Sequence, residues 1–124
     1  MRMNIDHVQL AAPVGCEDAA RSFFTGILDF NERPKFGAPA KRGGVWFEVG
    51  RLELHVGVVA NFMPAKKAHV AFCLDAVSAL EMLGERLEAD DYPVVWNDGL
   101  PGIRRFFSTD PWGNRLEFMA YENV

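Results

Sequence analysis

The chain has 124 residues, of which 49% are apolar, and its 13 Lys and Arg against 17 Asp and Glu give a formal net charge of −4. This composition predicts one globular domain with a core large enough to fold without disulfides or a structural metal. The negative charge and the lack of a basic cluster exclude a nucleic-acid footprint, and no apolar run approaches the roughly 18 residues of a membrane span. With only Cys16 and Cys73 and no signal-like segment, we expect a cytoplasmic protein with reduced thiols.

Residue periodicity in the first half of the chain predicts one helix and four strands. Apolar residues between positions 16 and 28 recur at helical spacing, whereas the strand segments alternate with period two. Gly and Pro residues between 34 and 44 predict a loop. The expected elements are a strand over 4–12, a helix over 16–28, and strands over 29–33, 45–49 and 51–59.

The second half repeats this order. Asp75 is a candidate N-cap of a helix that extends to about Glu88, and Asp110 to Gly113 fits a type I turn. The expected strands cover 67–74, 92–96, 103–109 and 114–121. The chain therefore has the order βαβββ twice, which predicts an α+β fold.

Two sequence matches support an internal repeat. The segment around His7 resembles the segment around His69, 62 residues later, and the segment around Glu53 resembles that around Glu117, 64 residues later. Self-similarity of this kind indicates two supersecondary units packed about a pseudo-two-fold axis. We predict one domain over residues 1–124 with modules at about 1–62 and 63–124.

Four of the predicted strands have an apolar face and an opposite face with His or Glu at mid-strand. If the repeat is real, two imidazoles and two carboxylates converge on one concave surface. Nitrogen and oxygen ligands without thiolate suit Zn, Ni, Co, Mn or Fe(II), and an octahedral ion would keep two positions for water or substrate. The predicted metal ligands are His7, Glu53, His69 and Glu117.

Three further residues are candidates for substrate binding. His55 follows Glu53 by two residues on the same strand face, so it could replace Glu53 as a ligand, bind substrate or transfer a proton. Trp46 could form a wall of the cavity. Arg105 could bind an anionic substrate through its guanidinium, although each of these residues, taken alone, is more often a surface or core group.

These residues also show a family likeness. The opening Ile5 to Val8, the segment Lys67 to Phe72 and the ending Asp-Pro-Trp-Gly-Asn-Arg-Leu-Glu at 110–117 resemble the vicinal oxygen chelate superfamily, which includes glyoxalase I, bleomycin and fosfomycin resistance proteins and extradiol dioxygenases. The resemblance implies two βαβββ modules that form a cup-shaped, largely antiparallel half-barrel with helices on the outside. Dimers are common in this superfamily, so it also implies a homodimer that acts on a small molecule.

The resemblance implies ligands as well. In glyoxalase I the first, fourth, fifth and eighth strands each supply one ligand, and the matching positions here are His7, Glu53, His69 and Glu117; members with three ligands lack the fourth-strand one. The implied activity is that of a lyase or isomerase. Its metal would chelate adjacent oxygens and stabilise an enediolate or oxyanion, with Glu53 or Glu117 moving the proton. An Fe(II) dioxygenase, a fosfomycin-type resistance enzyme and a metal-free antibiotic-binding protein are the alternatives.

Overall fold

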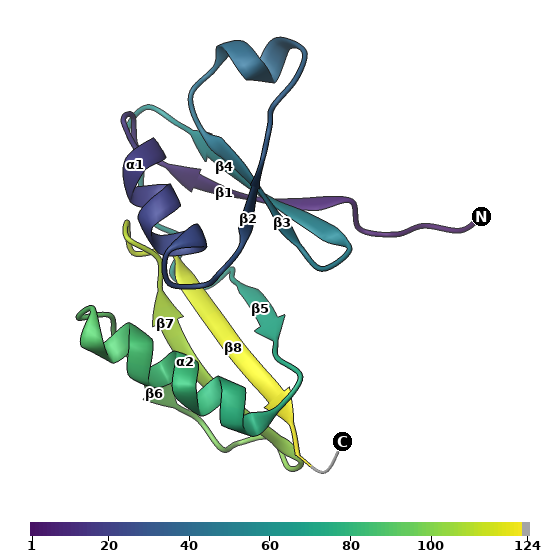
Figure 1. The fold of residues 1–124 in the computed structure, drawn as a ribbon, viewed down its shortest axis with the longest axis vertical. Helices are drawn as coiled ribbons and strands as arrows, with labels where there is room; N and C mark the ends of the chain where they lie inside the picture. Colours follow the sequence, from purple (N-terminus) through teal and green to yellow (C-terminus); the bar gives the residue numbers. More distant parts are fainter. Residues whose placement is uncertain (123–124) are drawn as a thin grey trace. The chain divides into compact units, whose positions relative to one another are not determined.

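The structure is a computed structural model that describes residues 1–122. It contains two compact units, a first module over Met1–Pro64 and a second module from Ala65 onward. Each has the order βαβββ (Figure 1), which confirms the predicted α+β class and the doubled module. No helix among the described residues is long and apolar enough to cross a membrane.

The sheet of the first module has the strand order β1-β4-β3-β2. Strands β1 and β4 are parallel, whereas β3 is antiparallel to both of its neighbours. Leu10 and Ala12 of β1 are buried on one face, while His7 and Gln9 lie on the other, as the alternation predicts. The strands are β1 His7–Ala12, β2 Asn31–Arg33, β3 Val45–Val49 and β4 Leu52–Val58.

The helix of the first module differs from the regular helix predicted over 16–28. Helix α1, Glu17–Ala20, continues into a π-helical segment, η1, over Arg21–Thr25. The wider π turn accompanies the burial of two adjacent side chains, Phe23 and Phe24, which a regular helix would direct to different sides. The predicted loop over 34–44 contains a short 3-10 helix, η2, at Ala38–Lys41.

The second module has the sheet order β5-β8-β7-β6, and helix α2 packs against β7 and β8 (Figure 1). Leu80 and Leu87 are fully buried on the packed face of α2. The helix begins after Ala76 without a side-chain cap, so Asp75 does not occupy the predicted N-cap position. The elements are β5 Val70–Cys73, α2 Val77–Ala89, β6 Val95–Trp96, β7 Ile103–Thr109 and β8 Arg115–Tyr121.

His69 lies just before β5, although the alternation predicts it within a strand over 67–74. The register of the β5 and β8 ladder would place Arg115 opposite His69, but the Arg115 N–H donates to the carbonyl oxygen of Ala65 at 2.8 Å. That bond removes the donor with which the ladder would continue, so the strand begins at Val70.

The turn that leads into β8 is held by one buried carboxylate. Oδ1 of Asp110 accepts hydrogen bonds from the backbone N–H groups of Trp112 and Asn114 at 3.0 and 2.9 Å, and Oδ2 accepts one from Asn114 Nδ2 at 2.7 Å. Oδ1 of Asn114 accepts from the N–H of Ala65 at 2.9 Å. Burial raises the pKa of the Asp110 carboxyl, against the lowering effect of the Asn114 bonds. This network fixes the start of β8, and with it Glu117.

Candidate functional site

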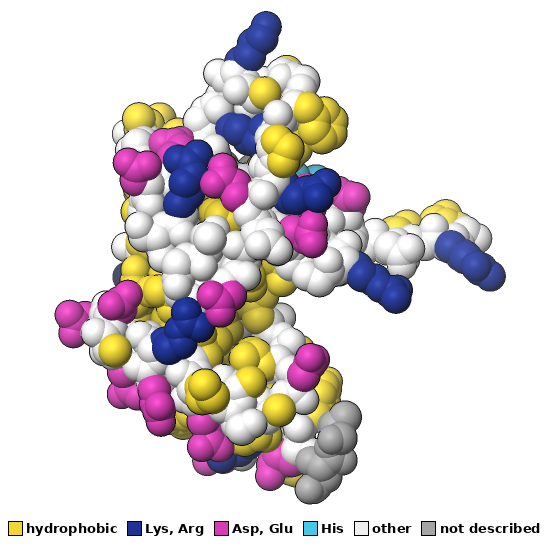
Figure 2. All heavy atoms as spheres, viewed as in Figure 1, with side chains coloured by type: hydrophobic (Ala, Val, Ile, Leu, Met, Phe, Trp, Pro, Cys, Tyr) yellow, Lys and Arg dark blue, Asp and Glu magenta, His cyan; other side chains and the backbone are white. Residues whose placement is uncertain are grey.

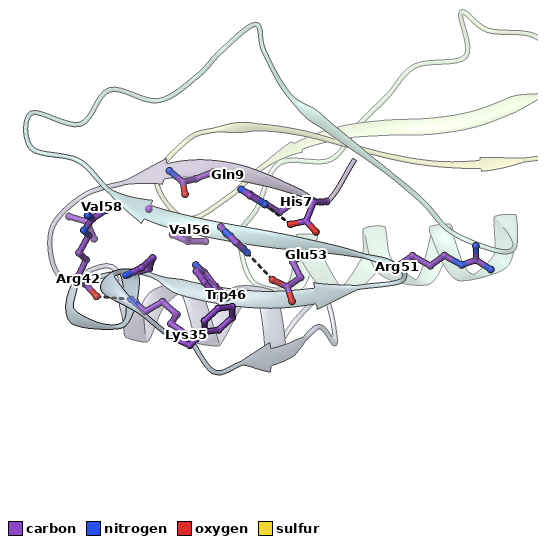
Figure 3. A pocket seen from close by; sticks show the side chains of 15 residues that line it. His7, Gln9, Lys35, Arg42, Trp46, Arg51, Glu53, Val56 and Val58 are labelled. Atoms are coloured by element: carbon purple, nitrogen blue, oxygen red, sulfur yellow. Dashed lines mark hydrogen bonds and ion pairs between the residues drawn. The ribbon is translucent and has the colours of Figure 1, made fainter. Parts of the chain in front are cut away.

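The polar face of the first sheet lines a cavity of about 630 Å³ (Figure 3). Strands β1, β3 and β4 supply its floor, and the loop from Lys35 to Gly43 supplies one side. His7, Gln9, Trp46 and Glu53 all contribute to its lining. Together with His55, the cavity therefore collects five polar or aromatic side chains from the face that the sequence predicts to be free of core packing.

Three rings stack side by side across this face. The His7 and His55 ring centroids are 4.2 Å apart at an interplanar angle of 12°, and those of His55 and Trp46 are 4.2 Å apart at 7°. Phe36, from the loop, meets Trp46 edge-on at 5.5 Å. His55 is only 7% exposed because it lies between the other two rings. The prediction that Trp46 could form a cavity wall is consistent with this arrangement.

A carboxylate joins the stack from the same strand. Glu53 Oε1 is 2.9 Å from His55 Nε2, and Glu53 Oε2 is 3.8 Å from Nε of Arg33. The remaining histidine, His7, has its Nδ1 2.9 Å from Oδ2 of Asp6. A carboxylate can only accept here, so Nδ1 of His7 donates this hydrogen bond.

The second module holds a similar group. His69 Nε2 is 2.9 Å from Glu117 Oε1, and Arg105 Nη1 is 3.5 Å from Glu117 Oε2. Arg105 also donates from Nη2 to Oδ1 of Asn97 at 3.3 Å. Two nitrogens of the Arg105 guanidinium thus contact protein groups, while its Nε has no hydrogen-bond partner within the described part of the chain.

Both ring nitrogens of His69 face oxygen atoms. Its Nδ1 is 2.9 Å from the carbonyl oxygen of Lys67, which can only accept, while its Nε2 faces the carboxylate of Glu117. A neutral imidazole carries one proton, so it cannot donate to both oxygens. Nε2 of His69 and Oε1 of Glu117 are therefore two neighbouring donor atoms of the types that could bind one divalent ion. Histidine ligands whose other nitrogen donates to a carbonyl are typical of metal sites.

The ladder registers show which residues of the two modules are equivalent. Glu117 pairs with the residue two positions after His69. The residue two positions after His7 pairs with His55, not with Glu53. His7 and His55 are also 48 residues apart, as are His69 and Glu117. The register therefore makes His55 the counterpart of Glu117, although the local sequence match predicts Glu53.

The predicted site residues fall into two groups. His7, Trp46, Glu53 and His55 lie together in the first module, while the second contains the remaining predicted site residues: His69, Arg105 and Glu117. Within residues 1–122, no three His, Cys, Asp or Glu side chains come close enough together to hold an ion.

Sequence reasoning missed several residues that line the cavity. Gln9 lies two positions after His7 on the same strand face, so the alternation that selected His7 could also have found it. Lys35, Phe36 and Arg42 belong to an aperiodic loop, where no sequence pattern indicates the direction of a side chain.

Comparisons with known proteins cover the whole chain. A profile of the Glyoxalase/Bleomycin resistance protein/Dioxygenase superfamily matches residues 4–118. The chain is similar to a structure described as a glyoxalase family protein from Bacillus anthracis, with 42% identity, 98% of each chain covered and a TM-score of 0.90. No curated protein matches the chain.

Two more distant structures share the fold alone. Lactoylglutathione lyase from Agrobacterium tumefaciens has 20% identity and a TM-score of 0.75, with 97% of this chain and 95% of that chain covered. The fosfomycin resistance protein FosX from Listeria monocytogenes has 15% identity and a TM-score of 0.78, with 99% and 97% covered.

Proposed function

Because the chain belongs to the Glyoxalase/Bleomycin resistance protein/Dioxygenase superfamily, we propose that it is a metal-dependent lyase or isomerase acting on adjacent oxygens of a small substrate. The observation that supports this most directly is the pair formed by His69 and Glu117. Its imidazole nitrogen faces a carboxylate oxygen at 2.9 Å while the other ring nitrogen faces a carbonyl. The pair brings together one imidazole nitrogen and one carboxylate oxygen, two donor types that bind divalent cations.

The donor set fits a divalent ion such as Zn, Ni, Mn, Co or Fe(II), because it combines imidazole nitrogen with carboxylate oxygen and contains no thiolate. We propose His7, His69 and Glu117 as ligands. The fourth-strand ligand predicted from the sequence is Glu53, whereas the ladder register favours His55. With His55 as the ligand, Glu53 is the carboxylate that orients its ring, a common arrangement around metal-bound histidine.

The ion would supply a Lewis acid for two neighbouring substrate oxygens. The rest of the chemistry falls to protein groups. Arg105 contacts Oε2 of Glu117 and so would help to orient this carboxylate as a metal ligand. Glu53 is more exposed than Glu117 and can change its position, so we assign proton transfer to its carboxylate. Trp46 lines the cavity in which the substrate would lie.

Elemental mass spectrometry on protein purified without an affinity tag tests the proposal. We expect about one equivalent of a divalent ion per chain, lost in His7→Ala and in Glu117→Ala. Glu32→Ala is a matched control, because Glu32 is an exposed β2 carboxylate outside the cavity lining whose hydrogen-bond partner is Arg21. Absence of metal after reconstitution with Ni, Zn, Mn and Fe(II) would overturn the proposal.

The same donors suit a second reaction class. Two imidazoles and one carboxylate, here His7, His69 and Glu117, form the ligand type of non-haem Fe(II) oxygenases. Oxygen uptake by the iron-loaded protein with a catechol separates this candidate from a lyase or isomerase. Consumption of fosfomycin without oxygen uptake would instead indicate the resistance-enzyme alternative.

We also propose that the protein is a homodimer. Strands β1 and β5 lie at the edges of their sheets, and an exposed edge favours pairing with another chain. Sedimentation equilibrium should give twice the chain mass of 13.9 kDa. A mass of one chain at micromolar concentration would contradict this assignment.

A further inference from the structure

The cavity of the first module contains apolar surface that no metal site requires. Phe36 is 76% exposed although it contacts Trp46, and Trp46 in turn stacks on His55. Exposure of aromatic surface to water is unfavourable, and covering it with another apolar group stabilises the protein by roughly 25 cal/mol per Å². A flat ring placed beside Trp46 and Phe36 would cover it and would interact with both aromatic faces.

The same loop supplies positive charge. Lys35 Nζ donates to the carbonyl oxygen of Arg42 at 2.6 Å, which links the two ends of the loop that contains η2. Neither Lys35 nor Arg42 forms an ion pair with any carboxylate in the described part of the chain. Figure 2 shows Lys and Arg side chains over this loop, whereas acidic side chains gather over α2.

The acidic groups of the cavity do not neutralise this charge. The two carboxylates in its lining are Asp6 and Glu53, and each is bonded to a histidine ring, Asp6 to His7 and Glu53 to His55. Lys35 also interacts electrostatically with Glu17, which lies outside the lining, so Arg42 is the loop cation that remains available for an anion. Arg42 has the planar guanidinium that binds a carboxylate through two parallel hydrogen bonds.

A polar group completes the lining. The side-chain amide of Gln9 lies against Gly57, where a Cβ atom would be only 2.7 Å from Gln9 Nε2. Glycine at position 57 thus leaves room for an amide that can both donate and accept in the cavity. The lining thus combines aromatic surface with a larger share of polar groups, and its volume lies within the range of about 300 to 1,000 Å³ typical of sites for small ligands.

We propose that this cavity of about 630 Å³ binds a flat aromatic carboxylate, with its ring beside Trp46 and Phe36 and its carboxylate on Arg42 and Lys35. All of the residues involved belong to the first module. Binding does not require the ion, so the inference goes beyond the proposed metal chemistry and does not depend on it.

Titration of the metal-free full-length chain tests the proposal. Protein treated with a chelator is titrated with 2-naphthoate and, as a neutral isostere, 2-naphthamide, while the indole N–H signal of Trp46 is followed by NMR and the heat by calorimetry. We expect naphthoate to bind at least about tenfold more tightly than the amide, the difference typical of a charge-assisted pair. Equal affinities, or no shift of the Trp46 signal, would overturn the proposal.

Two pairs of variants localise the site. Arg42→Gln should weaken naphthoate binding about tenfold, whereas Lys41→Gln, a neighbouring cation outside the cavity lining, should leave it unchanged. Trp46→Leu should weaken both probes, and Trp96→Leu in the second module should weaken neither. Equal effects within either pair would overturn the assignment. Absence of metal from every preparation would overturn the proposed enzymatic function but would not affect the expected binding of naphthoate.

Discussion

Each module contains a row of one His, one Glu and one Arg side chain in contact. The first row is His55, Glu53 and Arg33, and the second is His69, Glu117 and Arg105. The two rows differ in how deeply the carboxylate is buried. Glu53 is 2.9 Å from the ring of His55, and Glu117 is 2.9 Å from that of His69. The Glu117 side chain is 8% exposed, whereas that of Glu53 is 31% exposed. A buried carboxylate must keep its partners, because losing them leaves an uncompensated charge, while an exposed one can turn to solvent. We therefore expect the buried Glu117 to suit metal binding and the more exposed Glu53 to suit proton transfer.

The difference in burial follows from the strands that support each row. Arg105 lies on β7, an interior strand that pairs with β8 along its whole length. Arg33 lies on β2, an edge strand of three residues. The long ladder holds Arg105 against Glu117, whereas Arg33 reaches Glu53 from the rim. Variants of the two rows can break or sharpen this contrast.

The largest effect is expected for the two glutamates. Glu117→Gln should lower the affinity for the metal by more than the roughly 100-fold upper range of outer-shell variants, because it removes a ligand. Glu53→Gln should lower that affinity only about tenfold, as expected for a group that orients a ligand, but should slow turnover of any substrate. Competition with a fluorescent chelator measures the affinities. Equal losses of metal affinity would show that the rows are alike and that Glu53 is a ligand.

The buried turn before β8 should give the next largest effect. In Asp110→Asn, an NH₂ group replaces an oxygen that accepts from the backbone or from Asn114, so one donor loses its partner. We expect the free energy of unfolding to fall by about 2 kcal/mol. Urea denaturation measures it, with Asp98→Asn on an exposed loop as the control. A loss no larger than in the control would mean that the turn does not fix β8.

The pH dependence of the same variant follows from the sign of the shift. Burial raises the folded-state pKa of Asp110 above the ordinary value of 3.8, so the folded protein binds this proton more tightly than the unfolded chain. The stability that Asp110 contributes should therefore be complete below about pH 3.8 and should fall as pH rises through the folded pKa. Asp110→Asn should lack that component in denaturation series at several pH values.

Periodicity predicted most of the strands because side chains on a half-buried strand must alternate. The predicted strands at 45–49 and 103–109 match β3 and β7 residue for residue, and both are interior strands with continuous ladders. The π-helical segment could not be predicted, since it depends on burying both Phe23 and Phe24. The position of His69 before β5 could not be predicted either, because it depends on the hydrogen bond from the Arg115 N–H to the Ala65 carbonyl oxygen.

The candidate site was partly visible for the same reason. Mid-strand His and Glu on polar faces indicated His7 and Glu117, and the repeat drew attention to Glu53. A local sequence match cannot reveal ladder register, so the equivalence of His55 and Glu117 emerged only from the pairing. The loop residues Phe36 and Arg42 have no periodic neighbours, and nothing in the sequence places them in the cavity.

A smaller effect is expected from the two arginines. Arg105→Met keeps the packing of the stem but removes the contact to Oε2 of Glu117, so the metal should bind about tenfold more weakly, as for other second-layer partners. Arg33→Met should change metal affinity less than twofold, since an exposed ion pair contributes little. The same chelator competition measures both. An equal effect of the two variants would contradict the contrast between buried and exposed rows.

The smallest effect is expected for Glu17, a half-buried carboxylate that contacts a strand of the first module. Glu17 Oε2 accepts from the N–H of Gly44, just before β3, at 2.6 Å, and this bond lowers the pKa of Glu17. Glu17→Gln keeps an acceptor, so unfolding should become easier by less than about 1 kcal/mol, with Asp18→Asn as control. A lowered folded pKa gives stability that is complete above the ordinary value of 4.5 and is lost as pH falls. The difference in the free energy of unfolding between wild type and Glu17→Gln should therefore shrink below pH 4.5, opposite to the trend at Asp110. A trend in the same direction for both variants would show that the degree of burial does not distinguish the two carboxylates.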